Sequence, residues 1–308
     1  MYHRIAEPRC DPWGLSVGPR RFEEQVRALR TFRVPLSLGE FVSRLEKRTL
    51  PQLAVGITFD DGYIDNLRVA KPILEEAVVP ATVFLTTGLL GSRQEFWWDE
   101  LARLTLGRRE SAEGGVVVDG RSIAVRLPAL ASDGEVSSTW RAWEPPATER
   151  ERLYLELWEK LHGLGPRARE EGMRSLRDLL RSGAPDPSDL PMQSEDVPLL
   201  LSGDLIDIGA HAATHQPLTR LPVPERRQEI EGCRTACEAL VGKPVVGFAY
   251  PHGDRDQITK ELVRDSGFEW ACSSHGGTVD PNRFDRFDLS RLQAMNWTAQ
   301  ELRHALHA

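Results

Sequence analysis

Short apolar segments alternate with amphipathic segments in both halves of the chain, and this order constrains the fold more than any other feature. The apolar segments resemble strands buried on both faces of a sheet, and the segments between them repeat apolar residues at helical spacing. Repeated strand–helix units predict an α/β fold with a parallel sheet or barrel, whose chemistry lies on the loops after the strands. The predicted strands are 53–59, 81–87, 205–210, 245–250 and 268–274, and the predicted helices are 20–30, 66–77, 224–242 and 256–267.

The stretch from about residue 92 to 192 interrupts this order. A predicted helix at 96–104 is followed by a predicted β-hairpin, because Asp119–Gly120 is a strong two-residue turn signal. Two more helices are predicted at 149–164 and 167–183. We therefore expect one domain over residues 1–308, interrupted by a mixed α/β-hairpin insertion at about 92–192. A separate second domain is the alternative.

Two adjacent aspartates, Asp60 and Asp61, end the predicted strand 53–59. A buried carboxylate is costly unless it is paired, hydrogen-bonded or bound to a metal. We expect both side chains to lie together at the C-terminal end of the strand, where Gly62 lets the chain turn sharply. The strand therefore ends at a candidate polar site.

His211 and His215 lie four residues apart, directly after the predicted strand 205–210. In a helix or a tight turn, this spacing brings two imidazoles to one face, as metal sites require. Two unrelated surface or core histidines are the alternative. If the pair binds a metal, Asp61 can supply an oxygen ligand and leave open positions for water. The stretch "GFAYPHG" (247–253) ends another strand; it is either a simple turn or a wall beside the metal with a backbone N–H directed at a reacting carbonyl.

Composition and charge narrow the class of protein. The chain is 40% hydrophobic and 28% charged, as in globular proteins, and its formal net charge of −7 argues against a nucleic-acid or anionic-membrane partner. It has no apolar run of the ~20 residues needed to span a bilayer and no signal-peptide pattern, so we expect a cytoplasmic protein. A true start upstream of Met1 stays open. Cys233 and Cys237 lack a second ligand pair, which favours structural thiols.

The three polar stretches together resemble the polysaccharide deacetylase family, carbohydrate esterase family four. "TFDDG" matches the first motif, and "FAYPHG" matches a Y-P-x-G variant of the third. "HAATH" matches the histidines of the H-[ST]-x-x-H motif, with Ala212 in place of the hydroxyl residue. "YHRI" and "RRFEEQVRAL" resemble the branch found with bacterial exopolysaccharide biosynthesis. The resemblance covers residues 1–91 and 193–308.

This resemblance implies a distorted (β/α)7 barrel that hydrolyses an N-acetyl group on an amino sugar of a glycan or glycan precursor and releases acetate. It implies that Asp61, His211 and His215 bind a divalent metal, most simply Zn²⁺, which polarises the acetyl carbonyl. Asp60 would then be the general base. The metal and the backbone N–H of Tyr250 would stabilise the oxyanion.

The general acid is open, because the family's late L-x-H histidine has no counterpart in "DLSRLQAMNW". His3, His252 and His275 are the candidates near strand ends. We favour His3. A closed barrel places its first strand beside its last. A strand that carries the histidine would therefore occupy nearly the same position at the start of the chain as at its end. Similarly, we expect Arg291 to replace the arginine that orients the Asp60 carboxylate in the family.

Two other functions stay open at this point. One is a metal-dependent amidase or deacetylase acting on a small molecule or a nucleotide-linked sugar. The other is a non-catalytic glycan-binding relative, which would be expected to lose a ligand or the base. In the insertion, Phe96, Trp97 and Trp98 either stack on sugar rings or form the insertion's own core. The sequence indicates neither the sugar nor the oligomeric state.

Overall fold

The computed structural model describes residues 1–130, 139–181 and 183–306 and separates into two compact units. Met1–Glu7, Ser16–Ser92 and Pro191–Ala308 form the first, which we call the barrel unit. Pro8–Leu15 and Arg93–Leu190 form the second, which we call the insertion unit. Among the described residues, no helix is long and apolar enough to cross a bilayer.

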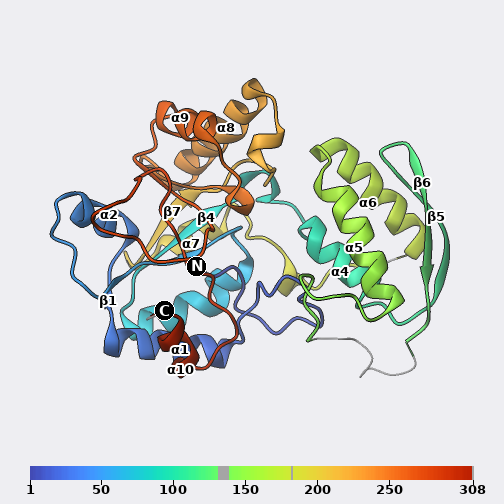
Figure 1. Ribbon diagram of the computed structural model, residues 1–308, viewed down its shortest axis with the longest axis horizontal. Helices are drawn as coiled ribbons and strands as arrows, with labels where there is room; N and C mark the ends of the chain where they lie inside the picture. Colours follow the sequence, from blue (N-terminus) through green and yellow to red (C-terminus); the bar gives the residue numbers. More distant parts are fainter. Residues whose placement is uncertain (131–138, 182, 307–308) are drawn as a thin grey trace. The chain divides into compact units, whose positions relative to one another are not determined.

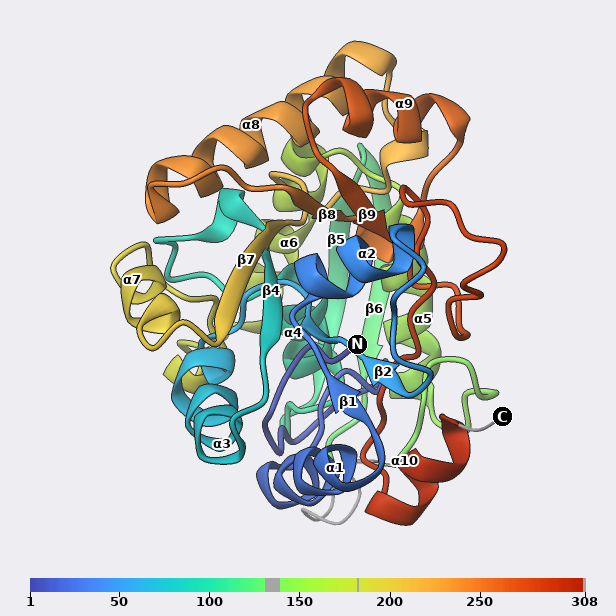
Figure 2. The same ribbon diagram turned by 90° about the vertical axis from the view of Figure 1, so that its left-hand side faces the viewer.

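A curled parallel sheet forms the centre of the barrel unit (Figure 1, Figure 2). Its strand order is β3 (Ile57–Phe59), β4 (Ala81–Leu85), β7 (Ile206–Ala210), β8 (Gly247–Ala249) and β9 (Trp270–Cys272). Isolated parallel bridges extend both edges, with Tyr2 paired to Phe59 and Leu289 paired to Cys272. The Ala294 N–H donates to the Met1 carbonyl, so the two added segments meet and close the ring. Five strands and two bridged segments make a distorted barrel, which confirms the predicted α/β barrel fold.

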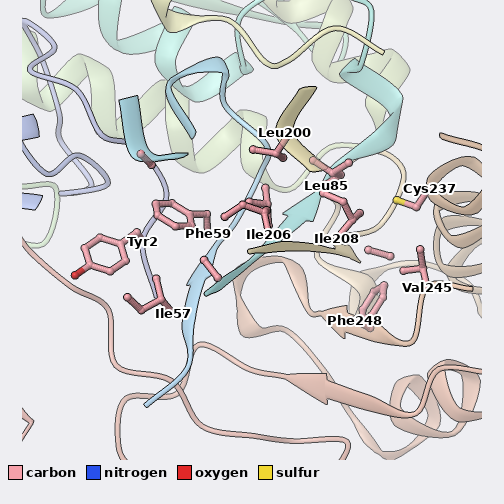
Figure 3. Packing of buried hydrophobic residues seen from close by; sticks show 14 of the residues in the cluster. Tyr2, Ile57, Phe59, Leu85, Leu200, Ile206, Ile208, Cys237, Val245 and Phe248 are labelled. Carbon is pink, nitrogen blue, oxygen red and sulfur yellow. The ribbon is translucent and has the colours of Figure 1, made fainter. Parts of the chain in front are cut away.

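Helices of the barrel unit pack on one face of this sheet and bury a continuous apolar core (Figure 3). Ile57 and Phe59 of β3 point into this core, so alternation directs Thr58 and Asp60 to the opposite face. Cys233 and Cys237 also belong to the core, and all four cysteines of the chain have free thiols, as expected for structural residues. The helices are α1 (Pro19–Phe32), α3 (Lys71–Ala77), α7 (Asp196–Leu201), α8 (Val223–Val241), α9 (Gln257–Asp265) and α10 (Ala299–Ala305).

A smaller apolar cluster fills the opposite face of the sheet. Phe84, Ala249 and Cys272 contribute to it from the strands, and α2 (Leu38–Glu46) contributes the side chains that cover it. The strands β1 (Val34–Pro35) and β2 (Ala54–Val55) flank α2 in sequence and form a short parallel pair. The interior of the barrel is therefore packed, apart from the polar side chains at the strand ends.

Two predicted elements are interrupted in the structure. The strand predicted at 53–59 is split at Gly56 into β2 and β3, which belong to different sheets. The helix predicted at 66–77 begins with the π-helical turn Asn66–Ala70 and becomes α-helical only in α3. Pro72 lies in the first turn of α3 and has no N–H to donate, which fits a change of hydrogen-bond pattern at that point.

The insertion unit has its own apolar core, formed by the buried face of a hairpin and by helices. Asp119 and Gly120 have φ values of 50° and 69°, and two positive values are what the predicted two-residue hairpin turn needs. The elements are α4 (Trp97–Thr105), β5 (Ala112–Val118), β6 (Arg121–Leu127), α5 (Glu149–His162) and α6 (Pro166–Leu180). Phe96 and Trp98 are 0% and 6% exposed and stack on each other, so these two rings are unavailable to a sugar.

The packing around Gly247 of β8 leaves no room for a side chain. A Cβ there would lie 2.1 Å from the Trp270 ring. We expect Gly247→Ala to lower the free energy of unfolding by about 1–3 kcal/mol through overpacking, as measured by urea denaturation. Gly232→Ala in α8 is the control, because its new Cβ meets no atom within 4 Å. It should stabilise the protein by about 0.5–1 kcal/mol. A Gly247→Ala protein as stable as the wild type would show that Trp270 moves at no cost.

Candidate metal centre and catalytic site

Asp60 and Asp61 occupy a tight turn at the C-terminal end of β3. Asp61 has a φ of 74° and Gly62 a φ of 84°, so two successive residues adopt the left-handed conformation that disfavours ordinary side chains. Position 62 admits only glycine without rearrangement, because a Cβ there would lie 2.8 Å from a methyl carbon of Leu85. The turn separates the two carboxylates into different surroundings.

His211 and His215 follow β7 in a loop with similar strain. Ala212 and His215 have φ values of 59° and 55°. The His211 N–H donates to the Leu85 carbonyl, and His211 Nδ1 lies 2.8 Å from the Ala249 carbonyl oxygen. A carbonyl can only accept, so Nδ1 carries the proton and the Nε2 lone pair is left for a ligand.

The structure brings Asp61, His211 and His215 together as a buried group. Asp61 Oδ1 lies 3.4 Å from His211 Nε2 and 3.2 Å from His215 Nε2, and the three ligating atoms lie within 4.8 Å of one another. Asp61 Oδ1 is buried yet forms no well-directed hydrogen bond to any described group. Burial raises the pKa of Asp61, but the two histidines outweigh burial and hold it well below its usual range. An ionised carboxylate and two imidazole nitrogens around one point are a donor set that fits a divalent cation.

Asp60 is paired with Arg291, as the sequence predicted. Two bonds of 2.7 Å join the guanidinium to both carboxylate oxygens, and Arg291 also donates to the Ser273 carbonyl and to the Thr58 hydroxyl. Asp60 and Arg291 are 3% and 7% exposed. Burial raises the pKa of Asp60, but Arg291 outweighs it, and the pKa falls below the ordinary value. The carboxylate is therefore ionised and fixed in orientation.

His3 lies beside this pair because its strand is bridged to β3. The Asp60 N–H donates to the Tyr2 carbonyl, and Asn66 Nδ2 donates to the His3 carbonyl at 2.8 Å. The Nδ1 atom of His3 is buried and has no hydrogen-bond partner among the described residues. Burial lowers the pKa of His3, against the attraction of Asp61 and Asp60. The imidazole thus shares the electrostatic environment of the two aspartates.

Asp65 and Asn66 hold the His3 strand in place, and the sequence analysis did not identify them. Asp65 accepts from the Ile5 N–H and from Arg4 Nε, while Asn66 holds the His3 carbonyl. No local pattern marked them, because Asp65 is followed by the polar Asn66 and its contacts with Arg4 and Ile5 form only in the folded chain.

The two other candidate acids have different surroundings. The His252 ring lies 4.5 Å from the His215 ring and is exposed, with a strained φ of 57°. His275 is exposed, and its Nδ1 accepts from Arg255, which Asp288 holds at 2.8 Å. Both side chains are exposed, whereas His3 is partly buried and its Nδ1 atom is fully buried.

The structure does not support the role predicted for Tyr250. Its backbone N–H donates to the Cys272 carbonyl at 3.1 Å, and its hydroxyl donates to the Phe287 carbonyl. The N–H that was expected to stabilise an oxyanion is therefore used in the pairing of β8 with β9. Tyr250 fixes the end of β8 in this structure.

Comparison with known proteins agrees with this geometry. The family model for polysaccharide deacetylases matches residues 47–110 and 194–271. A poly-beta-1,6-N-acetyl-D-glucosamine N-deacetylase of Staphylococcus aureus is 36% identical over 77 residues, 25% of this chain and 27% of the relative. The chain thus matches about a quarter of the length of its curated relatives.

Solved structures share the fold over nearly the whole chain. IcaB from Ammonifex degensii has a TM-score of 0.60 at 18% identity, covering 100% of this chain and 95% of that one. The Streptococcus pyogenes deacetylase PplD has a TM-score of 0.58 at 14% identity, covering 94% of this chain and 88% of that one. Deacetylases of this family are metal-dependent, which agrees with the Asp61–His211–His215 group. The chain therefore has the fold of these deacetylases, and two of its segments, 47–110 and 194–271, match the polysaccharide deacetylase family model.

Proposed function

We propose that this protein is a metal-dependent hydrolase that removes N-acetyl groups from an amino sugar in a glycan or glycan precursor and releases acetate. One observation carries the proposal: Asp61, His211 and His215 converge beside an Asp60 carboxylate that Arg291 keeps ionised. The substrate class agrees with the name of the Staphylococcus aureus relative, which acts on poly-beta-1,6-N-acetyl-D-glucosamine.

Zinc is the metal we propose for the site. Zinc binds imidazole nitrogen and carboxylate oxygen, and its catalytic sites typically have three protein ligands and one open position. Asp61, His211 and His215 supply such a set. Bound there, the ion would act as a Lewis acid on the acetyl carbonyl. Elemental analysis of the purified protein tests this assignment, and a different divalent metal at full occupancy would replace zinc in it.

Asp60 is the proposed general base. Its Oδ2 lies 3.8 Å from His211 Nε2, close to the ligand group but outside it. As a water oxygen bonds to the acetyl carbon, Asp60 takes the proton of that water, while Arg291 holds the carboxylate in position. The C–N bond then breaks, acetate forms, and the leaving nitrogen takes a proton from His3.

His3→Ala should lower kcat by about 10²–10⁴-fold, because the leaving amine loses its proton donor. A general acid acts in its protonated form, so activity falls as rising pH removes the proton. Burial lowers the pKa of His3, which moves this alkaline limb below that of an ordinary histidine. His275→Ala is the matched control and should retain kcat. A His3→Ala enzyme with full kcat and an unchanged alkaline limb would make His275 the leading candidate instead.

Acetate release from N-acetylated mono-, oligo-, lipid-linked and nucleotide-linked sugars tests the function. We expect release from oligosaccharides of N-acetylated amino sugars. Release from small or nucleotide-linked substrates alone would identify a small-molecule deacetylase. A metal-loaded protein that releases no acetate but binds glycan would be a non-catalytic relative and would contradict the proposal. The cytoplasmic location and the lack of a nucleic-acid partner stay predictions from the sequence.

A further inference from the structure

The loop that carries the two histidines is strained and lacks a hydroxyl group. Ala212 and His215 both have positive φ, a conformation that persists in non-glycine residues only when the surroundings enforce it. Ala212 stands where the resembling family has serine or threonine, so its own side chain cannot form a hydrogen bond that would fix the turn. Other contacts must therefore fix the relative positions of the His211 and His215 imidazoles.

Glu229 of α8 supplies these contacts. One carboxylate oxygen accepts from the Thr214 N–H at 2.7 Å, and the other accepts from the Thr214 hydroxyl at 2.6 Å. The backbone carbonyl of Glu229 accepts from the Ala213 N–H at 3.1 Å. A single helical residue thus contacts two of the three residues between His211 and His215.

The opposite side of the same loop contacts the segment that follows β4. The Gly88 N–H donates to the Ala213 carbonyl at 2.6 Å, and a Cβ at Gly88 would lie 2.5 Å from that oxygen. The absence of a side chain at Gly88 permits this close approach, and the Thr86 hydroxyl nearby donates to the His211 carbonyl at 3.4 Å. Glu229 therefore supplies side-chain hydrogen bonds to Thr214, which lies between the two histidines.

We propose that Glu229 is a positioning residue that holds the His211–His215 loop in its metal-binding conformation through Thr214, in the place of the hydroxyl missing at position 212. The proposal rests on the metal site of the proposed function. Without the Glu229 carboxylate, Ala212 and His215 can relax toward negative φ, which separates the two imidazole nitrogens from Asp61. The consequence is weaker metal binding in a protein that remains folded.

Zinc affinity, measured by competition with a chromogenic chelator on the full chain, tests the proposal. We expect Glu229→Ala to weaken zinc binding by roughly 10–100-fold, the effect typical of residues that orient metal ligands. Glu229→Gln keeps one acceptor and should fall between Glu229→Ala and the wild type. Glu231→Gln is the matched control on the same helix, because Glu231 is exposed and pairs with exposed Arg227. The zinc affinity of this variant should stay at the wild-type level.

Substitutions at Thr214 test the same hydrogen bonds from the side opposite Glu229. Thr214→Ser keeps the hydroxyl and should bind zinc like the wild type, whereas Thr214→Val removes it and should weaken binding. If Glu229→Ala does not fold, the Thr214 pair still decides the question. Glycine adopts a positive φ without strain, so Ala212→Gly should stabilise the same loop conformation. Added to Glu229→Gln, it should restore part of the zinc affinity that Glu229→Gln loses.

Three outcomes would overturn the proposal or its basis. Glu229→Ala and Thr214→Val with wild-type zinc affinity would overturn the positioning role. A wild-type chain that binds no divalent metal would overturn the metal site and the positioning role together. A wild-type chain that binds zinc tightly and loses affinity in Glu229→Ala, but releases no acetate, would support the positioning role and contradict the proposed function alone.

Discussion

Replacing His215 by alanine should remove the metal and the acetate release together. The side chain contributes one of three ligating atoms that lie within 4.8 Å of one another, and two remaining ligands cannot hold a divalent ion at catalytic concentrations of protein. The apo protein should still fold, because His215 lies at a strand-end loop and not in the apolar core. Metal content by elemental analysis and acetate release by the same preparation are the two measurements.

The control for His215→Ala is His304→Ala. His304 is exposed in α10, far from the ligand group in sequence, and its replacement should leave both quantities unchanged. A His215→Ala protein that keeps wild-type metal content and activity would show that Asp61, His211 and His215 are not the metal ligands. Loss of activity with full metal content would instead assign His215 to the substrate or the reaction.

The sequence allowed the grouping of Asp61, His211 and His215 to be predicted because of where the strands end. Asp61 follows β3 and His211 follows β7, and the carboxyl ends of parallel strands gather at one edge of a sheet. Alternating apolar segments predicted these strands, so the position of both side chains followed from local patterns. The assignment of this group as a metal site is a proposal that rests on the residue types and on the family resemblance.

The pairing of Asp60 with Arg291 could not come from any local pattern. The two residues are 231 positions apart, and Arg291 lies in no regular element. The prediction depended on the family resemblance and on closure of the barrel, which brings the segment around Leu289 next to the first strand. Two hydrogen bonds join these segments: the Ala294 N–H donates to the Met1 carbonyl, and the Met1 amino group donates to the Leu292 carbonyl.

Tyr250 and Glu229 show what sequence patterns omit. Whether a backbone N–H is free depends on the register of neighbouring strands, and the pairing of β8 with β9 uses the Tyr250 N–H. Glu229 appears in the sequence as one more charged residue of an amphipathic helix. Its contact with Thr214 depends on how α8 packs against β7, which is a property of the assembled fold.

Asp60→Asn should have a different effect from the ligand variants, namely loss of turnover with the metal retained. Asparagine cannot accept the proton of the attacking water, and removal of a general base typically lowers kcat by about 10²–10⁴-fold. The pKa of Asp60 lies below its ordinary value, so the wild-type carboxylate stays ionised at neutral pH and is protonated only in acid. The activity of Asp60→Asn should therefore stay low at every pH at which the wild type works.

A structural cost accompanies this substitution and must be measured separately. Asp60→Asn leaves the buried Arg291 charge without its carboxylate, and breaking a buried pair in this way costs about 3–5 kcal/mol. Urea denaturation gives that cost, and kcat is then compared under conditions in which both proteins are folded and carry equal metal. Asp61→Asn, one residue away, is the matched control and should lose the metal as well. Equal metal loss in Asp60→Asn and Asp61→Asn would show that both carboxylates are ligands, and the base would then have to be sought elsewhere.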